Sequence, residues 1–327
     1  MAVPEQCARC PRQASISLAP MIICAGESLV DVIPADEGNG ADRAVPGGGP
    51  MNAAVATARL GTPTAFVGRI STDVNGDLIW AHLEASGVDL RAAERGPEPT
   101  ARAIVTTKPV QSFRFEGENT ADASMRSVDL SALGPGPHII HAGTLGIFRG
   151  TTASALRHML EAHDGIVSFD PNIRPQVFPS VTEWMALAEP WIDRATIVKA
   201  SDEDLDWMGM SVDDLLDNGA AAVLRTAGPD GVDVHLPEHR PLTVPARPTT
   251  VADTVGAGDS FCGAVLSQLD RRNLTTIEAV AAIDAETWVD IVSFGVRAAS
   301  VTVGRLGADP PWESELADEG GNGAGAK

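Results

Sequence analysis

Short apolar runs of strand length alternate with helical patterns along most of this chain, and this alternation limits the possible folds most strongly. The strand-like runs lie at residues 21–24, 29–33, 64–67, 138–141, 166–169, 195–198 and 221–224. Helical spacing of apolar residues separates them, at residues 53–60, 78–85, 153–162, 181–191, 202–208 and 260–269. Strands that alternate with helices usually form parallel sheets, because each helix covers a face while the chain crosses over. The sequence therefore predicts an α/β fold, with a central, mostly parallel sheet and helices on both faces.

Two stretches interrupt the alternation and predict a small β insertion. Residues 34–46 are polar and rich in glycine, and residues 101–107 and 112–116 have the pattern of a hairpin. A β lid built from about residues 34–46 and 100–117 would account for both, and it could exclude water from a bound ligand. The alternative is an ordinary surface hairpin.

The two ends of the chain are expected to lie outside the folded domain. Residues 1–20 precede the first strand-like run and lack the long apolar centre of a secretory signal. Residues 313–327 contain too few apolar side chains to pack against a core. We therefore expect one domain over residues 21–312, between a disordered N-terminal extension and a disordered tail.

An excess of acidic residues argues against several classes of partner. The chain has 44 aspartates and glutamates against 24 lysines and arginines, a net charge of −20, and no basic stripe. Nucleic acids and anionic membrane surfaces are therefore not expected to bind it. The four cysteines are too few for a disulfide scaffold, and no apolar run approaches the roughly 20 residues that span a bilayer. These features predict a cytoplasmic location.

The segment Asp-Thr-Val-Gly-Ala-Gly-Asp, at residues 253–259, carries the strongest chemical signal. Its glycines allow a tight turn with bare N–H groups at the start of a helix, where the helix dipole favours an anion. Asp259 places a carboxylate at the same point, where it could take a proton from a hydroxyl. An anion cradle beside a base suits phosphoryl transfer to an alcohol. The chain has no Gly-x-x-x-x-Gly-Lys motif, so a triphosphate must be held by backbone N–H groups, arginines and a metal ion.

The residues alone leave other interpretations of this segment open. Asp259 could simply cap a helix, and the glycines could simply form a turn. A dinucleotide-binding fingerprint, which would indicate an oxidoreductase, fits less well because Phe261 stands where its last glycine should be. Hydrolase motifs of the Gly-x-Ser-x-Gly and His-Glu-x-x-His types do not occur in the sequence.

A second glycine-rich segment points to a family. Residues 46–54 read Pro-Gly-Gly-Gly-Pro-Met-Asn-Ala-Ala, well before the segment at 253–259. Two such signatures in this order, on an alternating α/β chain, resemble the ribokinase-like (PfkB) family of carbohydrate kinases over residues 21–310. The resemblance implies a ribokinase-like fold with a β lid over the sugar. Further segments, among them residues 26–31 and 112–115, make the chain most similar to the bacterial fructokinases of that family.

The resemblance implies a role for each of several residues. Asp259 would be the base that deprotonates the sugar hydroxyl, while the N–H groups of Gly256, Ala257 and Gly258 would stabilise the transferring phosphoryl group. The residues implied in sugar binding are Asp31, Gly47, Gly48, Asn52, Phe115, Arg174 and Asp259 itself. The residues implied in nucleotide binding are Lys199, Thr226, Gly228, Gly231, Gly256 and Gly258.

Several of these residues also have a purely structural interpretation. Asn52 could be a helix cap, Arg174 a surface charge, and residues 226–231 a plain turn. Asp31 is unusual even without the family, because a carboxylate inside an apolar strand is costly unless it is paired or faces a ligand.

The resemblance also implies cations and an assembly. Relatives carry Asn-x-x-Glu or Ser-x-x-Glu where this chain has Ser201-Asp202-Glu203-Asp204, so Asp204 would organise Mg²⁺ through water. Residues 305–308 resemble the segment that, with the backbone near Asp253, surrounds a monovalent cation in many relatives; here that ion would be K⁺. The lid would offer a surface for a homodimer.

Together these features predict an ATP- and Mg²⁺-dependent sugar kinase that transfers the γ-phosphoryl group to a sugar hydroxyl. Fructokinase is the first expectation, with a primary hydroxyl of a ketose as acceptor. One alternative is a 2-keto-3-deoxygluconate kinase, for which Arg102, Arg114 or Arg174 could bind the substrate carboxylate. Another is a catalytically silent sugar-binding protein of the same fold. Such a protein would be expected to lack Asp259 or the glycines before it, and both are present.

Overall fold

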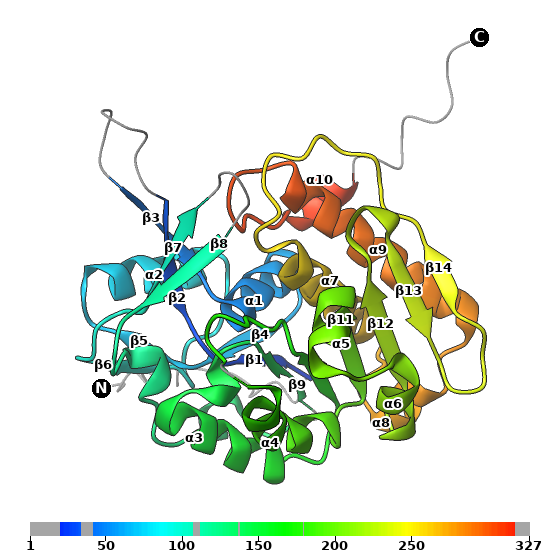
Figure 1. Ribbon diagram of the computed structural model, residues 1–327, viewed down its shortest axis with the longest axis horizontal. Coiled ribbons are helices and arrows are strands. Elements are labelled where there is room, and N and C mark those ends of the chain that lie inside the picture. Colours follow the sequence, from blue (N-terminus) through cyan, green and yellow to red (C-terminus); the bar gives the residue numbers. More distant parts are fainter. Residues whose placement is uncertain (1–19, 34–41, 107–111, 137, 179, 318–327) are drawn as a thin grey trace, which may run out of the picture.

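The computed structural model describes residues 20–33, 42–106, 112–136, 138–178 and 180–317. Within these ranges the main sheet has eight strands in the order β14-β13-β12-β11-β10-β9-β1-β4 (Figure 1). Their bounds are β1 Ile22–Ala25, β4 Thr64–Val67, β9 Ile139–Gly143, β10 Val167–Asp170, β11 Ile197–Ser201, β12 Ala222–Thr226, β13 Val232–His235 and β14 Leu242–Val244. The strands from β12 to β4 run parallel to one another, whereas β13 and β14 add an antiparallel edge. The predicted α/β fold with a mostly parallel sheet is confirmed, and the antiparallel edge is an addition that the alternation did not predict.

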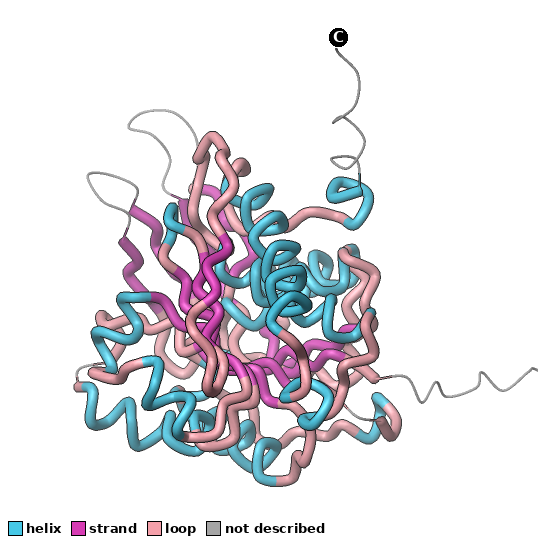
Figure 2. The backbone as a smooth tube through the Cα atoms, turned by 90° about the vertical axis from the view of Figure 1, so that its right-hand side faces the viewer, coloured by secondary structure: helices cyan, strands magenta, loops and turns pink. Residues whose placement is uncertain are grey.

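Helices cover both faces of this sheet, because the buried strands present apolar side chains to both sides. In β1, Ile22 and Cys24 belong to one core and Ile23 to the other, and all three are fully buried. One layer contains α1 (Gly49–Arg59), α2 (Val74–Ala85), α7 (Ala257–Arg271), α8 (Ile277–Ala281) and α9 (Ala285–Val303). The other layer contains α3 (Gly150–Glu161), α4 (Val181–Ile192), α5 (Asp202–Met208) and α6 (Val212–Asp217). Figure 2 shows the strands enclosed between helices.

The carboxyl ends of the parallel strands lie along one edge of the sheet, where open α/β sheets bind their ligands. Predicted site residues cluster at these ends: Asp31 follows β1, Arg174 follows β10, Asp204 follows β11, and Thr226 ends β12. The topology therefore collects residues that are far apart in the sequence.

A separate four-stranded sheet, in the order β3-β2-β7-β8, forms the predicted lid (Figure 1). Its strands are β2 Leu29–Ile33, β3 Arg43–Gly47, β7 Arg102–Thr106 and β8 Ser112–Glu116. Residues 29–33 thus belong to the lid and do not extend the first strand of the main sheet. The turn between β1 and β2 uses Gly26, whose φ of +152° is rare for other residues. Residues 34–41 and 107–111, which the lid prediction included, lie outside the described residues.

The folded domain continues past the predicted boundary at residue 312. Residues Glu313–Ala317 form α10, in which Leu316 packs in a small buried cluster with Leu60. Glu313 also forms an ion pair of 2.7 Å with Arg271. The prediction of a disordered tail is therefore wrong for residues 313–317, because one buried leucine and an ion pair hold a segment of mostly polar composition. Residues 1–19 and 318–327, the rest of the two predicted disordered ends, lie outside the described residues.

Smaller elements complete the part of the chain that the structure describes. Strands β5 (Arg69–Ser71) and β6 (Glu94–Gly96) pair as a short sheet. Four 3₁₀ helices span Ala121–Ala123, Ser131–Leu133, Gly146–Phe148 and Gly228–Asp230. No helix among the described residues is long and apolar enough to cross a membrane.

Candidate active site

Asp259 lies where the first turns of α1 and α7 meet. Gly263 allows these helices to pack closely, since a Cβ at that position would lie 2.7 Å from Ala56 Cβ and 2.8 Å from Ala53 O. This packing brings Asn52, in the first turn of α1, next to Asp259, in the first turn of α7. Asn52 Nδ2 donates a hydrogen bond of 2.9 Å to Asp259 Oδ2 across a sequence separation of 207 residues. The two glycine-rich signatures of the sequence therefore form one site.

The Asp259 carboxyl group has the surroundings of a proton acceptor. Burial raises its pKa, while the bond from Asn52 and then the charges of Lys199 and Arg174 oppose the increase without cancelling it. Asn52 Oδ1 is buried and accepts no hydrogen bond from any residue that the structure describes. Buried acceptors of this kind are normally satisfied. A ligand that donates from a hydroxyl group would satisfy this one.

The glycines before Asp259 form the start of α7 and supply free N–H groups. Gly256 is the N-cap residue, and no side chain caps the helix. The Ala257 N–H group donates to Thr254 O at a long 3.3 Å, and those of Gly256 and Gly258 make no hydrogen bond within the described residues. Unpaired N–H groups at the positive end of a long helix suit an anion. The alternative that Asp259 is the cap of this helix is wrong, because Gly256 holds that position.

Replacement of Gly256 by Ala is expected to lower the free energy of unfolding by about 2–4 kcal/mol. Gly256 has a φ of +75°, and an added Cβ would lie 2.4 Å from Ala308 Cβ. Urea unfolding followed by circular dichroism would measure the change. Gly228→Ala is a matched control, since Gly228 has a φ of +52° but open space around the position of a Cβ. We expect a loss of only about 1 kcal/mol in the control, so equal losses would contradict the role of the Ala308 contact.

Asp31, on the lid strand β2, lies beside the glycine turn that precedes α1. A Cβ on Gly47 would lie 2.5 Å from Asp31 Oδ2, so any side chain at position 47 would displace the carboxylate. Gly48 has a φ of +116°, and a Cβ there would lie 2.8 Å from Glu27 O. The structure therefore brings Asp31, Gly47 and Gly48 together, as the sequence predicts.

Electrostatic coupling joins Asp31 and Arg174 to Asp259. Burial raises the pKa of Asp31 to about 7, with further increases from the charges of Asp259 and Asp253. Arg174 lowers the pKa of both Asp31 and Asp259. The Arg174 Nη1 group donates to the backbone oxygens of Asn172 and Ile173 at 3.1 Å each. Its own loop thus holds Arg174 near the carboxylates, and it is not an isolated surface charge.

Glu27 is a further candidate that the sequence analysis did not assign. Its side chain is fully buried, with Oε1 accepting the Gly49 N–H at 3.1 Å and Oε2 accepting the Gly146 N–H at 2.7 Å. These bonds tie the start of α1 to the segment that follows β9. Burial raises the pKa of Glu27 to about 7, although the backbone bonds lower it. The signal was available in the sequence, because Glu27, like Asp31, is a carboxylate beside an apolar run.

Phe115 lies on β8, where it is partly buried against the lid cluster around Leu29 and Ala101. Its position in the lid agrees with the prediction, and its packing links the lid to the partly buried Phe178. The structure therefore places Phe115 in the lid, and its role in sugar binding stays a prediction.

Lys199 and Asp170, on the neighbouring strands β11 and β10, form a buried ion pair. Lys199 Nζ lies 3.1 Å from Asp170 Oδ1, and the two side chains are 8% and 4% exposed. A Cβ on Gly258 would lie 3.2 Å from Lys199 Nζ. Lys199, which the resemblance assigns to nucleotide binding, therefore lies directly against the first turn of α7.

Asp204 occupies a capping box at the start of α5. Its Oδ2 accepts hydrogen bonds of 2.9 and 2.7 Å from the N–H and hydroxyl groups of Ser201, and its Oδ1 accepts one of 2.7 Å from the Ile173 N–H. Both carboxylate oxygens of Asp204 thus accept hydrogen bonds from protein groups. Among the described residues, no group of three or more His, Cys, Asp and Glu side chains could hold a metal ion. The geometry fits Asp204 as the capping-box partner of the N-cap residue Ser201 and does not fit direct coordination of a cation.

The remaining predicted residues lie in two loops. In the turn after β12, the Ala227 N–H donates to Gly231 O at 2.9 Å, and the φ of Gly231 is +104°. Asp253 Oδ2 accepts the Gly307 N–H at 2.9 Å and its Oδ1 accepts the Val255 N–H at 3.1 Å. The loop that begins at Asp253 therefore meets residues 305–308, as the resemblance implies.

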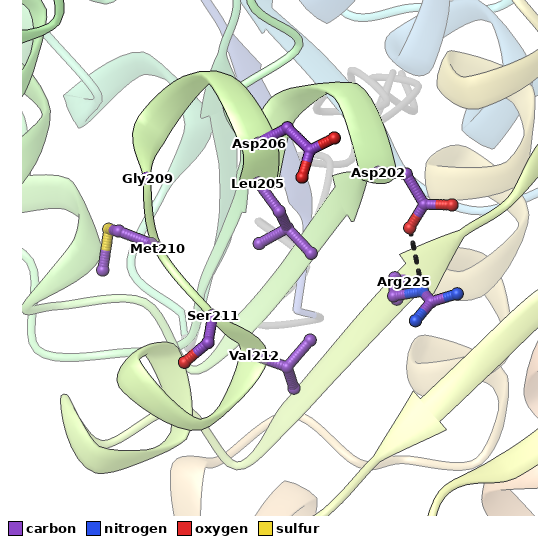
Figure 3. A pocket seen from close by; sticks show the side chains of 8 residues that line it. All are labelled: Asp202, Leu205, Asp206, Gly209, Met210, Ser211, Val212 and Arg225. Atoms are coloured by element: carbon purple, nitrogen blue, oxygen red, sulfur yellow. Dashed lines mark ion pairs between the residues drawn. The ribbon is translucent and has the colours of Figure 1, made fainter.

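The cavity between α5 and α6 is separate from this cluster. It has a volume of about 480 Å³, and Figure 3 shows Asp202 directed toward Arg225 beside it, in an ion pair of 3.0 Å. Leu205 and Val212 also line it. Among the described residues that line this cavity, none has a predicted role in sugar binding, nucleotide binding or proton transfer. The cluster around Asp259 is therefore the candidate site for the predicted chemistry.

Known proteins resemble this chain in sequence and in fold. Residues 19–315 match the pfkB family of carbohydrate kinases. A fructokinase of Rhizobium leguminosarum bv. trifolii is 36% identical over 277 residues, which cover 81% of this chain and 85% of that protein. The structure of a fructokinase from Xylella fastidiosa with bound ATP superposes with a TM-score of 0.82 at 26% identity, over 92% of this chain and 98% of that one. A fructokinase from Vibrio cholerae O395 with bound fructose, ADP and calcium ion gives a TM-score of 0.75 at 27% identity, over 89% and 95% of the two chains.

Proposed function

The chain belongs to the pfkB family of carbohydrate kinases, and we propose that within this family it is a fructokinase. As a member it is an ATP-dependent sugar kinase. Fructose is proposed as the acceptor because a relative that spans most of the chain is a fructokinase, and because a fructokinase with bound fructose shares the fold.

One observation carries the proposed chemistry: the hydrogen bond between Asn52 Nδ2 and Asp259 Oδ2 at the N-terminus of α7. Asn52 occupies one carboxylate oxygen, so Oδ1 of Asp259 is the atom proposed to receive the proton of the sugar hydroxyl. Burial raises the pKa of Asp259 and so favours its acceptance of a proton.

The proposed step is a single displacement at the γ-phosphorus atom. The sugar hydroxyl transfers its proton to Asp259, its oxygen forms a bond to the γ-phosphorus, and the bond from that phosphorus to the bridging oxygen breaks to release ADP. The N–H groups of Gly256, Ala257 and Gly258 would stabilise the charge on the transferring group, an effect of about 3–4 kcal/mol per donor in other enzymes. Asp31, Gly47, Gly48, Asn52 and Arg174 are proposed to bind the sugar, with Phe115 covering it from the lid. Thr226, Gly228 and Gly231 are proposed to border the nucleotide.

Magnesium is proposed to arrive with the nucleotide. Asp204 does not fit direct coordination of Mg²⁺, since both of its carboxylate oxygens already accept hydrogen bonds from the protein. Any contact of Asp204 with the ion would therefore pass through water. Bound to phosphate oxygens, Mg²⁺ would neutralise part of their charge. Wild-type turnover that persists when a chelator removes all divalent ions would contradict this proposal.

Two further proposals concern K⁺ and assembly. We propose that K⁺ binds between the loop beginning at Asp253 and residues 305–308. Unchanged activity with tetramethylammonium as the sole monovalent cation would contradict this proposal.

The lid has two edge strands, β3 and β8, and unpaired edges can join two copies of a chain. A homodimer through the lid is therefore proposed, and light scattering that gives the monomer mass would rule it out.

A substrate screen tests the proposed function. Wild-type protein with ATP and Mg²⁺ would be offered fructose, 2-keto-3-deoxygluconate, ribose and nucleosides, with ADP release measured by a coupled assay. We expect kcat/KM for fructose to exceed that for every other acceptor by at least about tenfold, a difference of about 1.4 kcal/mol. Preference for 2-keto-3-deoxygluconate would reassign the substrate. Absence of sugar-dependent ADP release with all of them would refute the function.

A further inference from the structure

Two residues at the carboxyl ends of neighbouring strands have backbone conformations that their side chains disfavour. Thr144, directly after β9, has a φ of +52°, and Asn172, two residues after β10, has a φ of +38°. In the part of the chain that the structure describes, five residues other than glycine have a positive φ, and three of them are asparagines. Asparagine tolerates the left-handed region, whereas a β-branched side chain is strained there. Thr144 is the one β-branched residue of these five.

The side chains of Thr144 and Asn172 bond to each other beside the start of α1. Asn172 Nδ2 donates a hydrogen bond of 3.3 Å to Thr144 Oγ1. A Cβ on Gly49 would lie 2.4 Å from Thr144 Oγ1 and 3.4 Å from Asn172 Nδ2. Both polar groups therefore lie against Gly49, the residue that directly follows Gly47 and Gly48 of the predicted sugar site.

Asn172 also contacts a second part of the predicted sugar site. Its backbone oxygen accepts a hydrogen bond of 3.1 Å from Arg174 Nη1. Asn172 therefore contacts Thr144 through its side chain and Arg174 through its backbone. The N–H group of Gly49 is itself held by Glu27 Oε1 at 3.1 Å. Groups that follow three neighbouring parallel strands, β1, β9 and β10, thus meet around this one glycine.

We propose that Thr144 and Asn172 are positioning residues for the sugar. In this assignment Thr144 Oγ1, oriented by Asn172, fixes the turn at residues 47–49, while the Asn172 carbonyl group holds Arg174 at the same site. Strained backbone persists only where the surrounding structure maintains it, and it is concentrated at functional sites. The inference rests on the proposed function, because that function identifies the ligand of the turn as a sugar.

The alternative is that the pair only connects the ends of β9 and β10. A backbone bond already makes this connection, since the Thr144 N–H donates to Asp170 O at 3.1 Å. Glycine would keep that bond and would adopt a positive φ without steric cost. For stability alone, the threonine side chain therefore adds strain at a place where the backbone already joins the two strands.

Three variants at position 144 separate the hydroxyl group from the strain. Thr144→Ser keeps the hydroxyl group, Thr144→Ala keeps only the strained Cβ, and Thr144→Gly removes both. With fructose and ATP varied in steady-state kinetics, we expect Thr144→Ala and Thr144→Gly to raise KM for fructose about 10-fold. Their kcat and KM for ATP should change less than about threefold, and Thr144→Ser should stay within about twofold of the wild type throughout.

Thermal unfolding of the same variants tests the strain. We expect Thr144→Gly to unfold about 2–4 °C above Thr144→Ala, because a Cβ is unfavourable in the left-handed region. In an ordinary helical or extended position, glycine would be the less stable of the two. A variant that is more stable than Thr144→Ala and still binds sugar poorly is a combination that a purely structural role does not produce.

Glu238 offers a matched control. It has a φ of +60° in the exposed turn between β13 and β14, far along the sheet from β9. Glu238→Gly should likewise unfold above Glu238→Ala, while both keep the wild-type KM for fructose. An increase of that KM in either control would show that relief of strain anywhere in the chain impairs sugar binding.

A double-mutant cycle tests whether the two residues act together. Asn172→Ala removes the donor to Thr144 but keeps the backbone oxygen that holds Arg174. We expect it to raise KM for fructose by several-fold, and the double variant Thr144→Ala/Asn172→Ala to be no worse than about twofold beyond the weaker-binding single variant. Effects of the two substitutions that simply multiply would show that the residues act independently.

The outcomes distinguish this inference from the function on which it rests. Absence of sugar-dependent turnover in the wild type would refute the proposed function and the inference with it. Wild-type turnover of fructose, together with an unchanged KM for fructose in Thr144→Ala and Asn172→Ala, would overturn the inference alone. Lower stability of Thr144→Gly than of Thr144→Ala would overturn it as well, since no strain would then be stored at position 144.

Discussion

Replacement of Asp259 by Asn is expected to lower kcat by about 10²- to 10⁴-fold while KM for sugar and ATP changes only a few-fold. The amide keeps the size of the side chain and can still bond to Asn52, but it cannot accept the proton of the sugar hydroxyl. The loss should therefore fall on the chemical step and not on binding. Steady-state kinetics with both substrates varied would measure it.

Asp270→Asn is the matched control for this prediction. Asp270 lies near the other end of α7, so the same change of side chain leaves the first turn intact. We expect wild-type kinetics from this control. Turnover of Asp259→Asn within a few-fold of the wild type would refute the assignment of Asp259 as the base.

Replacement of Asp31 by Asn is expected to lower kcat/KM for the sugar by about 10²-fold, because hydrogen bonds to a charged group contribute about 1.5–3 kcal/mol each. Nucleotide affinity should change little, since Asp31 lies on the lid strand β2. Glu116→Gln is the control, because Glu116 is a lid carboxylate on β8 that pairs with Arg102 at 3.7 Å. An equal loss in that control would indicate damage to the lid as a whole.

Asp31→Asn should also change how the free energy of unfolding depends on pH. The pKa of Asp31 is raised to about 7 in the folded protein, so the native state holds this proton more tightly than the unfolded chain does. The contribution of Asp31 to stability is therefore present below about pH 4 and is lost as the pH rises to about 7. Relative to the wild type, Asp31→Asn should be more stable at pH 8 by on the order of 4 kcal/mol, and the difference should vanish near pH 4. Thermal unfolding across this range would show it, and a difference independent of pH would contradict it.

Local patterns predicted the elements of the sheet and its helices well where periodicity was strong. Thr64–Val67 and Asp202–Met208 have the predicted bounds. The short strands β5 and β6 escaped prediction, because three residues carry no periodicity and pairing alone makes them strands. Ala285–Val303 forms a long helix that the sequence analysis did not assign, although Asp284 caps it and the apolar spacing was present. The helix Glu313–Ala317 was missed because its composition is polar and one leucine anchors it.

What the sequence by itself determined was the chemistry available: a carboxylate after two glycines at the start of a helix, and a glycine turn followed by Asn52. These are properties of adjacent residues, since glycine geometry and helix ends depend on local backbone. Only the tertiary structure decided which groups meet. The close packing of α1 against α7 at Gly263 pairs Asn52 with Asp259, and the parallel order of β10 and β11 pairs Asp170 with Lys199. Burial, which raises the pKa of Asp31, Glu27 and Asp259, likewise exists only once the layers have packed, because desolvation depends on neighbours from distant parts of the chain.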